Sequence, residues 1–572
     1  MEERPVLILG AGVNGLSLAR ELTLNGVSVW VVDVADLGSG ATSRSSRLIH
    51  GGLRYLEYGD FSLVRESLAE RSRLLQLAPH CIRPLRLHIP VRRRCGGWLN
   101  AICRFLGASR FKAVNWVARF ARQKTERGLW LIRAGLWFYD RFAARSAGRE
   151  AFQPYAVHNL GNSGTPEFSE GSYRWTCSYS DAQMIAPERF CVALANDARQ
   201  AADETGVDFR LLTYHEVTRS GSDVTLRPIN ENGNKNGPEQ TVRPAVLVNA
   251  TGAWGDRTLE DLNVESRRLL GGTKGSHFIT YHAELRNRLK ENGIYAESAD
   301  GRMVFVLPLG DGTLVGTTDE RFEGDPREAI ATDRELDYLI EMVNEVLGNL
   351  GLTREDVSLR YSGVRPLPYS GSRSPGAISR GHSIEHHADA GLQILTLVGG
   401  KLTTARAFGE LACDDVLSIL NQTRKADTRS RPLPGGKNYP ASPAAIDETC
   451  QQIAAENGWP IASVRAVWSL FGSETENVIH DLAADDTTLL DGSEIPRCVV
   501  KWIIKHEWVS RLSDLVEQRL MLVYQPQLTR RALTQLAECL AETGRLAPDD
   551  IEPSVTKQVE RLQQMYGRSI TE

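Results

Sequence analysis

Residues 6–15 read VLILGAGVNG, and this stretch decides the fold. Its four leading apolar residues have the composition of a buried parallel strand, and three glycines follow in a GxGxxG arrangement. Apolar residues then recur at helical spacing, and a second apolar run, residues 27–32, ends at Asp33. A strand, a glycine turn, a helix, a strand and an acid in this order are typical of a dinucleotide-binding site.

Each residue of this fingerprint has a predicted task. Gly10 permits the tight turn, Gly12 lets a pyrophosphate approach the backbone, and Gly15 lets the helix pack closely on the strand. The N–H groups at the helix start hold phosphates. Asp33 accepts from a ribose hydroxyl, and we include Asn14 of the turn among the cofactor-binding residues.

Two later segments extend the predicted site. Residues 246–248 and 392–398 are apolar strands, and each is followed by a turn of small residues. Three segments of the chain that reach one site suit a large, extended cofactor. If that cofactor is a flavin, a helix N-terminus beneath it would stabilise the negative charge of its reduced form. Taken singly, each turn is also compatible with an ordinary strand–helix junction. The residues assigned to the cofactor here are Ala250, Gly252, Gly400, Leu402, Thr403 and Thr404, with Thr403 or Thr404 as a helix cap.

Composition excludes several classes of protein. The chain has 572 residues, of which 42% are hydrophobic and 24% charged, so it is neither disordered nor of low complexity. A net charge of -4 gives no reason to expect a nucleic-acid partner. Nine cysteines without a CxxC pair favour a reducing compartment, and neither a disulfide framework nor a metal site is expected.

Residues 41–57, ATSRSSRLIHGGLRYLE, resemble the signature of FAD-dependent, quinone-linked glycerol-3-phosphate dehydrogenases. The resemblance covers essentially the whole chain in the family's order. Departures are Asp33 where the family commonly has Glu, Gly381 where it commonly has Asp, and a longer segment between about residues 92 and 145. Further resembling segments are 274–277 (KGSH), 316–319 (GTTD), 361–367 (YSGVRPL), 374–380, 399–404 (GGKLTT) and 506–519.

The resemblance implies FAD as the cofactor and sn-glycerol 3-phosphate as the substrate. The alcohol would be oxidised to dihydroxyacetone phosphate by hydride transfer to flavin N5, and the electrons would pass to a membrane quinone. Two alternatives stay open: a flavin oxidase or amine dehydrogenase that uses oxygen or another acceptor, and a non-catalytic flavin-binding membrane sensor. The sequence leaves the oligomeric state open, with a homodimer as one possibility.

The resemblance also implies that four cations converge on the substrate. Arginine suits a phosphate because its planar fork binds the oxygens bidentately. We therefore expect substrate contacts from Arg54, Arg365, Arg380 and Lys401, with Lys274 as a further candidate.

His50 is the candidate general base, since a neutral imidazole is available near physiological pH. Alternatively, His50 only hydrogen-bonds the flavin or the backbone. Arg365 could instead polarise the reacting oxygen, and Tyr55 is a third polar candidate near the same loop. The surrounding residues expected at the cofactor are Ser45, Ser46, Leu48, Gly51 and Gly52.

Other polar groups carry less weight. Asp319 and Glu320 are interpreted as a structural turn, because nothing else in the sequence supports glycosidase chemistry. Three histidines lie in a segment that we predict to be a solvated loop without zinc spacing, namely His382, His386 and His387.

The segment 92–145 carries 13 Lys or Arg residues against two acids, Glu126 and Asp140. Lys and Arg combined with Trp and Phe on an amphipathic helix are typical of a membrane-interface helix. We therefore predict contact with an anionic membrane surface, in a cytoplasmic protein attached peripherally to the inner face of the cytoplasmic membrane. The alternative is a packing helix with a charged outer face. The helical spacing is set by Leu129, Ile132, Leu136, Tyr139 and Ala143.

The predicted fold class is α/β, with a Rossmann-like FAD-binding domain, an interleaved cap domain built on an antiparallel sheet, and a C-terminal helical domain. A linker rich in Pro and Gly separates the helical part. The expected bounds are 1–75, 178–255 and 360–424 for the FAD-binding domain, 76–177 and 256–359 for the cap, 425–441 for the linker, and 442–572 for the helices.

Overall fold

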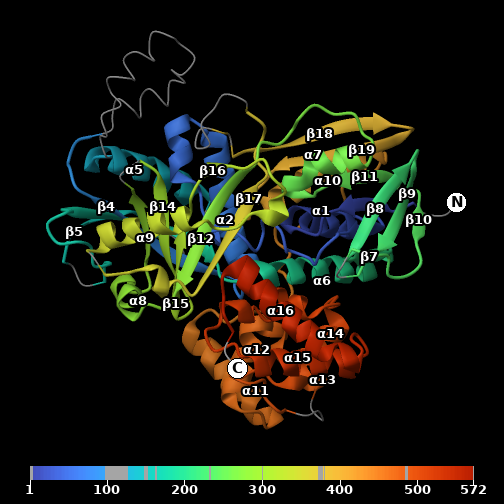
Figure 1. The fold of residues 1–572 in the computed structure, drawn as a ribbon. Coiled ribbons are helices and arrows are strands. Elements are labelled where there is room, and N and C mark those ends of the chain that lie inside the picture. Colours follow the sequence, from blue (N-terminus) through green and yellow to red (C-terminus); the bar gives the residue numbers. More distant parts are fainter. Residues whose placement is uncertain are drawn as a thin grey trace.

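The structure is a computed structural model of the chain (Figure 1). The side chains of residues 54, 57, 58 and 144–146 lie outside its description. The described residues are 4–96, 127–146, 153–161, 164–230, 233–298, 301–348, 350–370, 378, 380–482 and 487–570.

Among these residues, a six-stranded sheet of order β18-β19-β11-β1-β2-β7 forms the nucleotide-binding layer. Strand β1 pairs in parallel with β2 and β11, and β11 pairs in parallel with β19. The carboxyl ends of these strands therefore meet at one edge, where ligands of open α/β sheets bind. The strand bounds are β1 (Val6–Leu9), β2 (Val29–Val32), β7 (Phe209–Leu212), β11 (Val246–Asn249), β18 (His382–Asp389) and β19 (Leu392–Gly399).

Helices cover this sheet because its central strands are buried on both faces. Apolar side chains of β1, β2, β11 and β19 form one cluster with residues of the flanking helices. A three-stranded sheet of order β10-β9-β8 lies beside the layer. The bounds are α1 (Val13–Leu24), α6 (Pro187–Thr205), α7 (Gly255–Asp261), α10 (Ala405–Ile419), β8 (His215–Ser220), β9 (Asp223–Pro228) and β10 (Gln240–Val242).

The second large sheet has ten strands within the described ranges and is mainly antiparallel. Its central order is β16-β12-β15-β14-β13-β4-β6-β3, with β17 on β12 and β5 on β6. The strand bounds are β3 (Leu48–Ile49), β4 (Ile82–Val91), β5 (Ala156–Asn159), β6 (Trp175–Met184), β12 (Thr273–Thr280), β13 (Gly293–Glu297), β14 (Met303–Leu309), β15 (Gly312–Gly316), β16 (Glu320–Arg321) and β17 (Leu359–Arg365).

Helices pack around this sheet and are amphipathic. The capping box of Thr332 and Glu335 starts α9, whose apolar face forms a cluster with strands of the sheet. The bounds are α2 (Phe61–Leu77), α5 (Leu129–Ser146), α8 (Ala283–Leu289) and α9 (Asp333–Leu347), with a 3-10 turn at Leu53–Tyr58.

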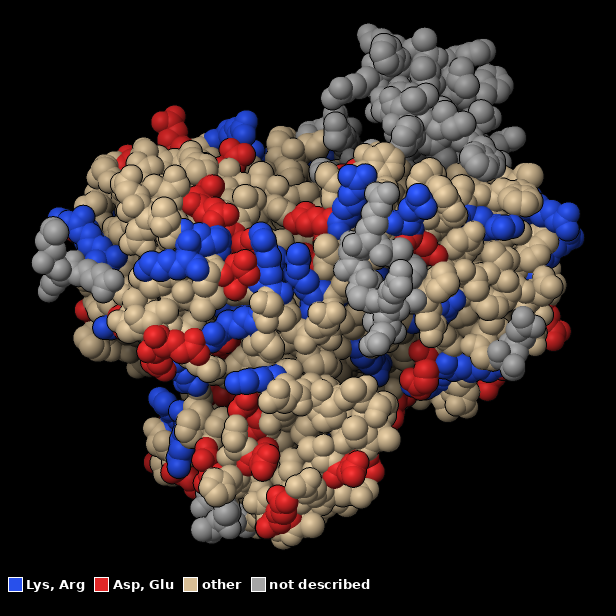
Figure 2. Space-filling view, turned by 180° about the vertical axis from the view of Figure 1, so that it is seen from behind, with Lys and Arg blue, Asp and Glu red and all other residues tan. Residues whose placement is uncertain are grey.

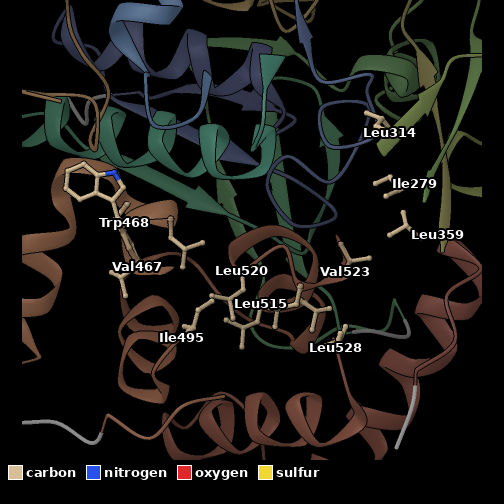
Figure 3. Packing of buried hydrophobic residues seen from close by; sticks show 14 of the residues in the cluster. Ile279, Leu314, Leu359, Val467, Trp468, Ile495, Leu515, Leu520, Val523 and Leu528 are labelled. Carbon is tan, nitrogen blue, oxygen red and sulfur yellow. The ribbon is translucent and has the colours of Figure 1, made fainter. Parts of the chain in front are cut away.

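The C-terminal helices form a body of their own beneath α6 (Figure 1). We call the described residues from 442 to 570 the C-terminal module. Its apolar core merges with side chains of the second sheet, because Ile279, Leu314 and Leu359 belong to the same cluster as the helices (Figure 3). The helices are α11 (Pro443–Asn457), α12 (Ile461–Phe471), α13 (Thr475–Asp481), α14 (Arg497–His506), α15 (Arg530–Glu542) and α16 (Ile551–Tyr566), with a π-helical turn at Asp514–Arg519 and a 3-10 turn at Leu522–Tyr524.

The three-part fold class is confirmed, but two details differ from prediction. Strand β6 spans residue 178, and β17 begins one residue before 360, so both expected boundaries cut strands of the second sheet. The predicted polar loop of three histidines is wrong, because all three lie on the edge strand β18. An edge strand with mixed polar residues lacks the alternation that marks a half-buried strand.

Across the face seen in Figure 2, basic and acidic side chains are interspersed. This mixture agrees with the small net charge of the chain. Among the helices that the structure describes, none is both long and apolar enough to cross a bilayer.

Candidate active site

The turn between β1 and α1 requires glycine at two positions. Gly10 has φ +107°, and a Cβ there would lie 2.6 Å from the carbonyl oxygen of Ala250. At Gly15 a Cβ would lie 2.0 Å from the oxygen of Gly10. Gly12 is the N-cap of α1, so the first helical amides lie beside this turn. The turn thus offers a backbone surface suited to a pyrophosphate.

Asp33 stands at the end of β2, next to that turn. Its carboxylate accepts from the N–H groups of Ala11 at 2.8 Å and Ala35 at 2.9 Å. Burial raises the pKa of Asp33 to about 6, although these bonds oppose the shift. The carboxylate fixes the turn and retains lone pairs for further donors.

The two later turns reach the same edge of the sheet. Gly252 and Gly400 have φ values of +62° and +92°, and a Cβ on Gly400 would lie 2.5 Å from Asn14 Nδ2. Asn14 Nδ2 donates to the carbonyl of Gly399 at 3.2 Å, and Ala250 N–H donates to that of Leu9 at 2.8 Å. Residues far apart in the sequence therefore close on one another here.

Polar atoms at this edge include two without a partner among the described residues, Asn14 Oδ1 and Thr404 Oγ1. Both are buried, and such atoms are normally hydrogen-bonded. Thr404 is the N-cap of α10 but makes no side-chain cap bond, and Thr403 instead accepts from His50 N–H at 3.2 Å. Thr404 therefore occupies the predicted cap position, but its hydroxyl does not make the bond of a cap. The glycine surfaces and unpaired atoms fit an extended dinucleotide such as FAD, and Leu402 packs beside them.

Ser45, Ser46 and Leu48 lead from the nucleotide layer into the second sheet. The carbonyl of Ser45 accepts from Tyr361 Oη at 2.8 Å, and Ser46 Oγ lies 2.8 Å from His277 Nε2. Leu48 is buried in β3 and pairs with β6. These contacts join the cofactor side of the site to β12 and β17.

His50 follows β3 directly. Burial, together with the positive charges of Lys401 and Arg380, lowers the pKa of His50 to about 3. The imidazole is therefore neutral at physiological pH and has a lone pair for a proton. Gly51 N–H donates to Tyr139 Oη at 2.9 Å, and Gly52 has φ +75°, so the backbone beside His50 is fixed.

Lys401 and Tyr55 lie far apart in the sequence but meet in space beside His50. Lys401 Nζ lies 4.4 Å from the centre of the Tyr55 ring and donates to Ser67 Oγ at 3.2 Å. The Tyr55 and His50 ring centres are 6.3 Å apart. The three predicted residues therefore form one group.

Arg365 and Arg380 share one carboxylate, that of Asp319. Arg365 Nη1 lies 3.3 Å from Asp319 Oδ1, and Arg380 Nη2 lies 3.1 Å from Asp319 Oδ2. Arg365 Nη2 also donates to Thr317 Oγ1 at 2.7 Å. Two guanidinium groups that converge on one pair of oxygens have the arrangement that a phosphate requires.

The remaining two cations differ. Lys274 Nζ is buried and donates to Glu335 at 2.8 Å and to the carbonyl of Ile330 at 3.0 Å, so its charge is already paired. The backbone of Arg54 lies in the 3-10 turn Leu53–Tyr58, while its side chain lies outside the described part. A substrate contact from Arg54 stays a prediction.

Sequence reasoning missed two polar residues of this region. Asp319 was interpreted as a turn residue, but its carboxylate joins the two arginines. His277 contacts Ser46, stacks on Tyr361 with ring centres 5.0 Å apart, and has its pKa lowered to about 3 by burial and by Arg365 and Arg47. The GTTD and KGSH segments that contain them were the only signal.

Comparisons with known proteins identify the family and the fold of the chain. The family model described as "FAD dependent oxidoreductase" matches residues 5–414. A glycerol-3-phosphate dehydrogenase of Synechocystis sp. is 32% identical, over 90% of this chain and 88% of the relative. A D-erythritol 1-phosphate dehydrogenase of Brucella abortus is 29% identical, over 90% and 93%. The solved glycerol-3-phosphate dehydrogenase from Bacillus halodurans, complexed with FAD, superimposes with a TM-score of 0.69 at 19% identity and covers 99% of this chain and 95% of its own.

Proposed function

The chain belongs to the family of FAD-dependent oxidoreductases, and we propose that it oxidises sn-glycerol 3-phosphate to dihydroxyacetone phosphate. A membrane quinone is the proposed acceptor of the electrons. The observation that carries the proposal is the pair of arginines on one carboxylate, next to a neutral histidine and a lysine.

The charges of this group suit a phosphate dianion. Arg365, Arg380 and Lys401 are positive and Asp319 is negative, so these four groups together carry two positive charges. An ammonium substrate would be repelled by the same groups, which argues against an amine dehydrogenase. A site with this balance would bind a small phosphorylated alcohol.

Bound FAD supplies the hydride acceptor. The chain's residues bind and orient the alcohol: Arg365 and Arg380 hold the phosphate oxygens, which fixes the distance of the carbinol carbon from the histidine. His50 Nδ1 or Nε2 takes the hydroxyl proton as the carbon–hydrogen bond breaks. Lys401 and Arg380 favour negative charge on the reacting oxygen during this transfer.

Helix α5 supports a membrane partner. Its buried face carries the five residues predicted from helical spacing, while Trp130, Trp137 and Phe138 are 49%, 50% and 48% exposed. Arg133 lies over the Trp130 ring and Arg141 over that of Trp137. An exposed face of aromatic rings and arginines suits an anionic lipid surface, where a quinone would be reached. Residues 97–126 of the insert lie outside the described residues.

A substrate panel in steady state tests the proposed activity. With a soluble quinone analogue as acceptor, we expect kcat/KM for sn-glycerol 3-phosphate to exceed that for glycerol by on the order of 10²–10⁴, since two charge-assisted hydrogen bonds contribute about 1.5–3 kcal/mol each. A D-erythritol phosphate is the control for chain length. Faster turnover of the four-carbon phosphate would reassign the substrate, and equal turnover of glycerol would refute a phosphate site.

The acceptor is tested separately, by following the quinone analogue and peroxide in the same air-saturated reaction. The proposal predicts that quinone reduction accounts for nearly all turnover and that peroxide is minor. Stoichiometric peroxide with no quinone reduction would instead identify an oxidase. No reduction of either acceptor would favour a non-catalytic sensor.

A further inference from the structure

Residues 33–47, which we call the cofactor loop, form the outer wall of the dinucleotide turn. Gly38 N–H donates to the carbonyl of Ala11 at 2.9 Å, and Thr42 Oγ1 accepts from Val13 N–H at 3.2 Å. Asp33, at the start of the loop, holds Ala11 as described above. A shift of this loop would therefore move the first turn of α1 and the acid that faces the ribose.

The other side of the cofactor loop meets the C-terminal module through a buried ion pair. Arg519 Nη1 and Nη2 lie 2.6 and 3.0 Å from the two carboxylate oxygens of Asp36. The side chains are 0% and 5% exposed. Arg519 also donates to the carbonyls of Glu507 at 2.9 Å and Trp508 at 3.2 Å, so its guanidinium is fixed within the module.

Two further residues of the loop contact the module. The Arg47 guanidinium lies 4.4 Å from the centre of the Tyr524 ring and pairs with Glu188 of α6, and Tyr524 Oη donates to the same carboxylate at 3.0 Å. The Arg44 guanidinium lies 5.2 Å from the centre of the Tyr566 ring. The beginning and the end of the loop are thus both held from the module side.

The module does not depend on these contacts to stay attached. Arg189 of α6 forms a second buried ion pair with Glu507, with distances of 2.5 and 2.9 Å, and also contacts the Leu470 carbonyl and the Phe471 ring of the module. Apolar side chains such as Leu515, Leu520 and Val523 share a cluster with the second sheet (Figure 3). Loss of the Asp36–Arg519 pair therefore releases the beginning of the loop without undocking the module.

Buried ion pairs are a poor source of stability, because desolvation offsets their attraction. The best-attested role of a buried ion pair is to select one arrangement of the chain among several. The Asp36–Arg519 pair would select the position of the cofactor loop. We propose that Arg519 is a positioning residue for FAD: through Asp36 it holds the cofactor loop against α1, so that docking of the C-terminal module and binding of FAD are coupled.

The experiment compares FAD dissociation constants of the full-length chain, measured by equilibrium titration of flavin fluorescence after removal of the cofactor. Arg519→Met should raise the dissociation constant about tenfold or more, and Arg519→Lys, which keeps the charge without the planar fork, should give an intermediate value. The matched control is Arg189→Met, which breaks an equally buried pair between α6 and the module but leaves the Glu507 carbonyl that accepts from Arg519 in place. It should lower the melting temperature but change the FAD dissociation constant less than twofold.

Binding of FAD should also raise the melting temperature less in Arg519→Met than in the wild type, because coupling is reciprocal. If Arg519→Met does not fold, Asp36→Asn decides, since its amide is nearly isosteric and should still weaken FAD binding several-fold. The proposal is overturned if Arg519→Met or Asp36→Asn binds FAD as the wild type does, or if Arg189→Met weakens FAD binding as much as Arg519→Met.

Discussion

At the scale of single residues, His50 combines burial with two neighbouring cations, and both lower its pKa. A phosphate dianion on Arg365 and Arg380 would offset the positive charge of Arg380 and so raise the pKa of His50 in the substrate complex. We expect the acid limb of kcat to lie at a higher pH than that of kcat/KM, because these profiles report the complex and the free enzyme respectively.

His50→Asn should remove this difference and slow flavin reduction in single turnover by about 10²–10⁴, the usual contribution of a general base. The measurement is anaerobic stopped flow between pH 5 and 9. An unchanged rate across this range would exclude His50 as the base and leave Tyr55 or Arg365 as the polar group next to the alcohol.

Asp319 holds two arginines together and also subtracts one charge from their site. Asp319→Asn should therefore tighten competitive inhibition by inorganic phosphate about tenfold, because the site attracts the anion more strongly without the carboxylate charge. The same change should lower kcat, because the two guanidinium groups lose the partner that holds them together. Asp325→Asn is the control, since that carboxylate pairs with Arg257 and Arg327 instead. Weaker inhibition by phosphate in Asp319→Asn would contradict the assignment.

We expect Asp33 to make FAD binding dependent on pH. Its raised pKa of about 6 means that the carboxylate takes up a proton between pH 7 and 5 and loses acceptor strength toward a ribose hydroxyl. FAD affinity should fall over this interval, whereas Asp33→Asn should bind weakly at every pH. The same pH dependence in both proteins, measured by fluorescence titration, would assign the titration to another group.

The sequence predicts local features of the site well and long-range ones poorly. Gly10 and Gly15 are recognisable because backbone contacts within one βα turn demand them. The Asp319–Arg365 contact joins positions 46 apart, and it depends on the strand register of β12 with β16 and β17. No spacing rule contains that register, so Asp319 was assigned to a turn.

At the scale of elements, α5 carries the surface that we propose for membrane contact. Replacing Trp130 and Trp137 by Ser should reduce flotation with anionic liposomes at low salt several-fold. The membrane contact would lose both rings, and the two arginines would lose the rings that they lie over. Tyr369→Ser is the matched control, since Tyr369 is 46% exposed and also lies under an arginine, Arg268. Equal flotation of the double variant would remove α5 as the docking surface.

Elements with a clear hydrophobic period were predicted well. The strand expected at residues 392–398 is β19, and the helical spacing at 129–143 is the buried face of α5. The edge strand β18 was missed because hydrogen bonds to β19, not side-chain burial, define it. The spacing of apolar residues reveals which side chains are buried. It does not reveal a strand such as β18, whose side chains are largely exposed to water.

At the scale of the whole molecule, the nucleotide layer and the second sheet are interleaved along the chain, and the C-terminal module follows them as one segment. The nucleotide layer is assembled from segments that end at Leu9, Asn249 and Gly399, and the second sheet begins within the same early segment at β3. The order of the motifs predicts this interleaving. The turns assigned to one cofactor site lie near residues 10, 250 and 400, so the chain between them has to form other structure. The contacts that join the C-terminal module to the cofactor loop were not predictable, since they depend on packing between bodies.

We propose that a bound flavin faces the site in which Arg365 and Arg380 hold a phosphorylated alcohol. The most direct test is an anaerobic titration of the oxidised holoprotein with sn-glycerol 3-phosphate, followed by the flavin absorbance. The account predicts bleaching with one equivalent of dihydroxyacetone phosphate per flavin, and little bleaching with glycerol or in an Arg365→Met, Arg380→Met double variant. A flavin that stays yellow with sn-glycerol 3-phosphate, or that bleaches equally in the double variant, would contradict it.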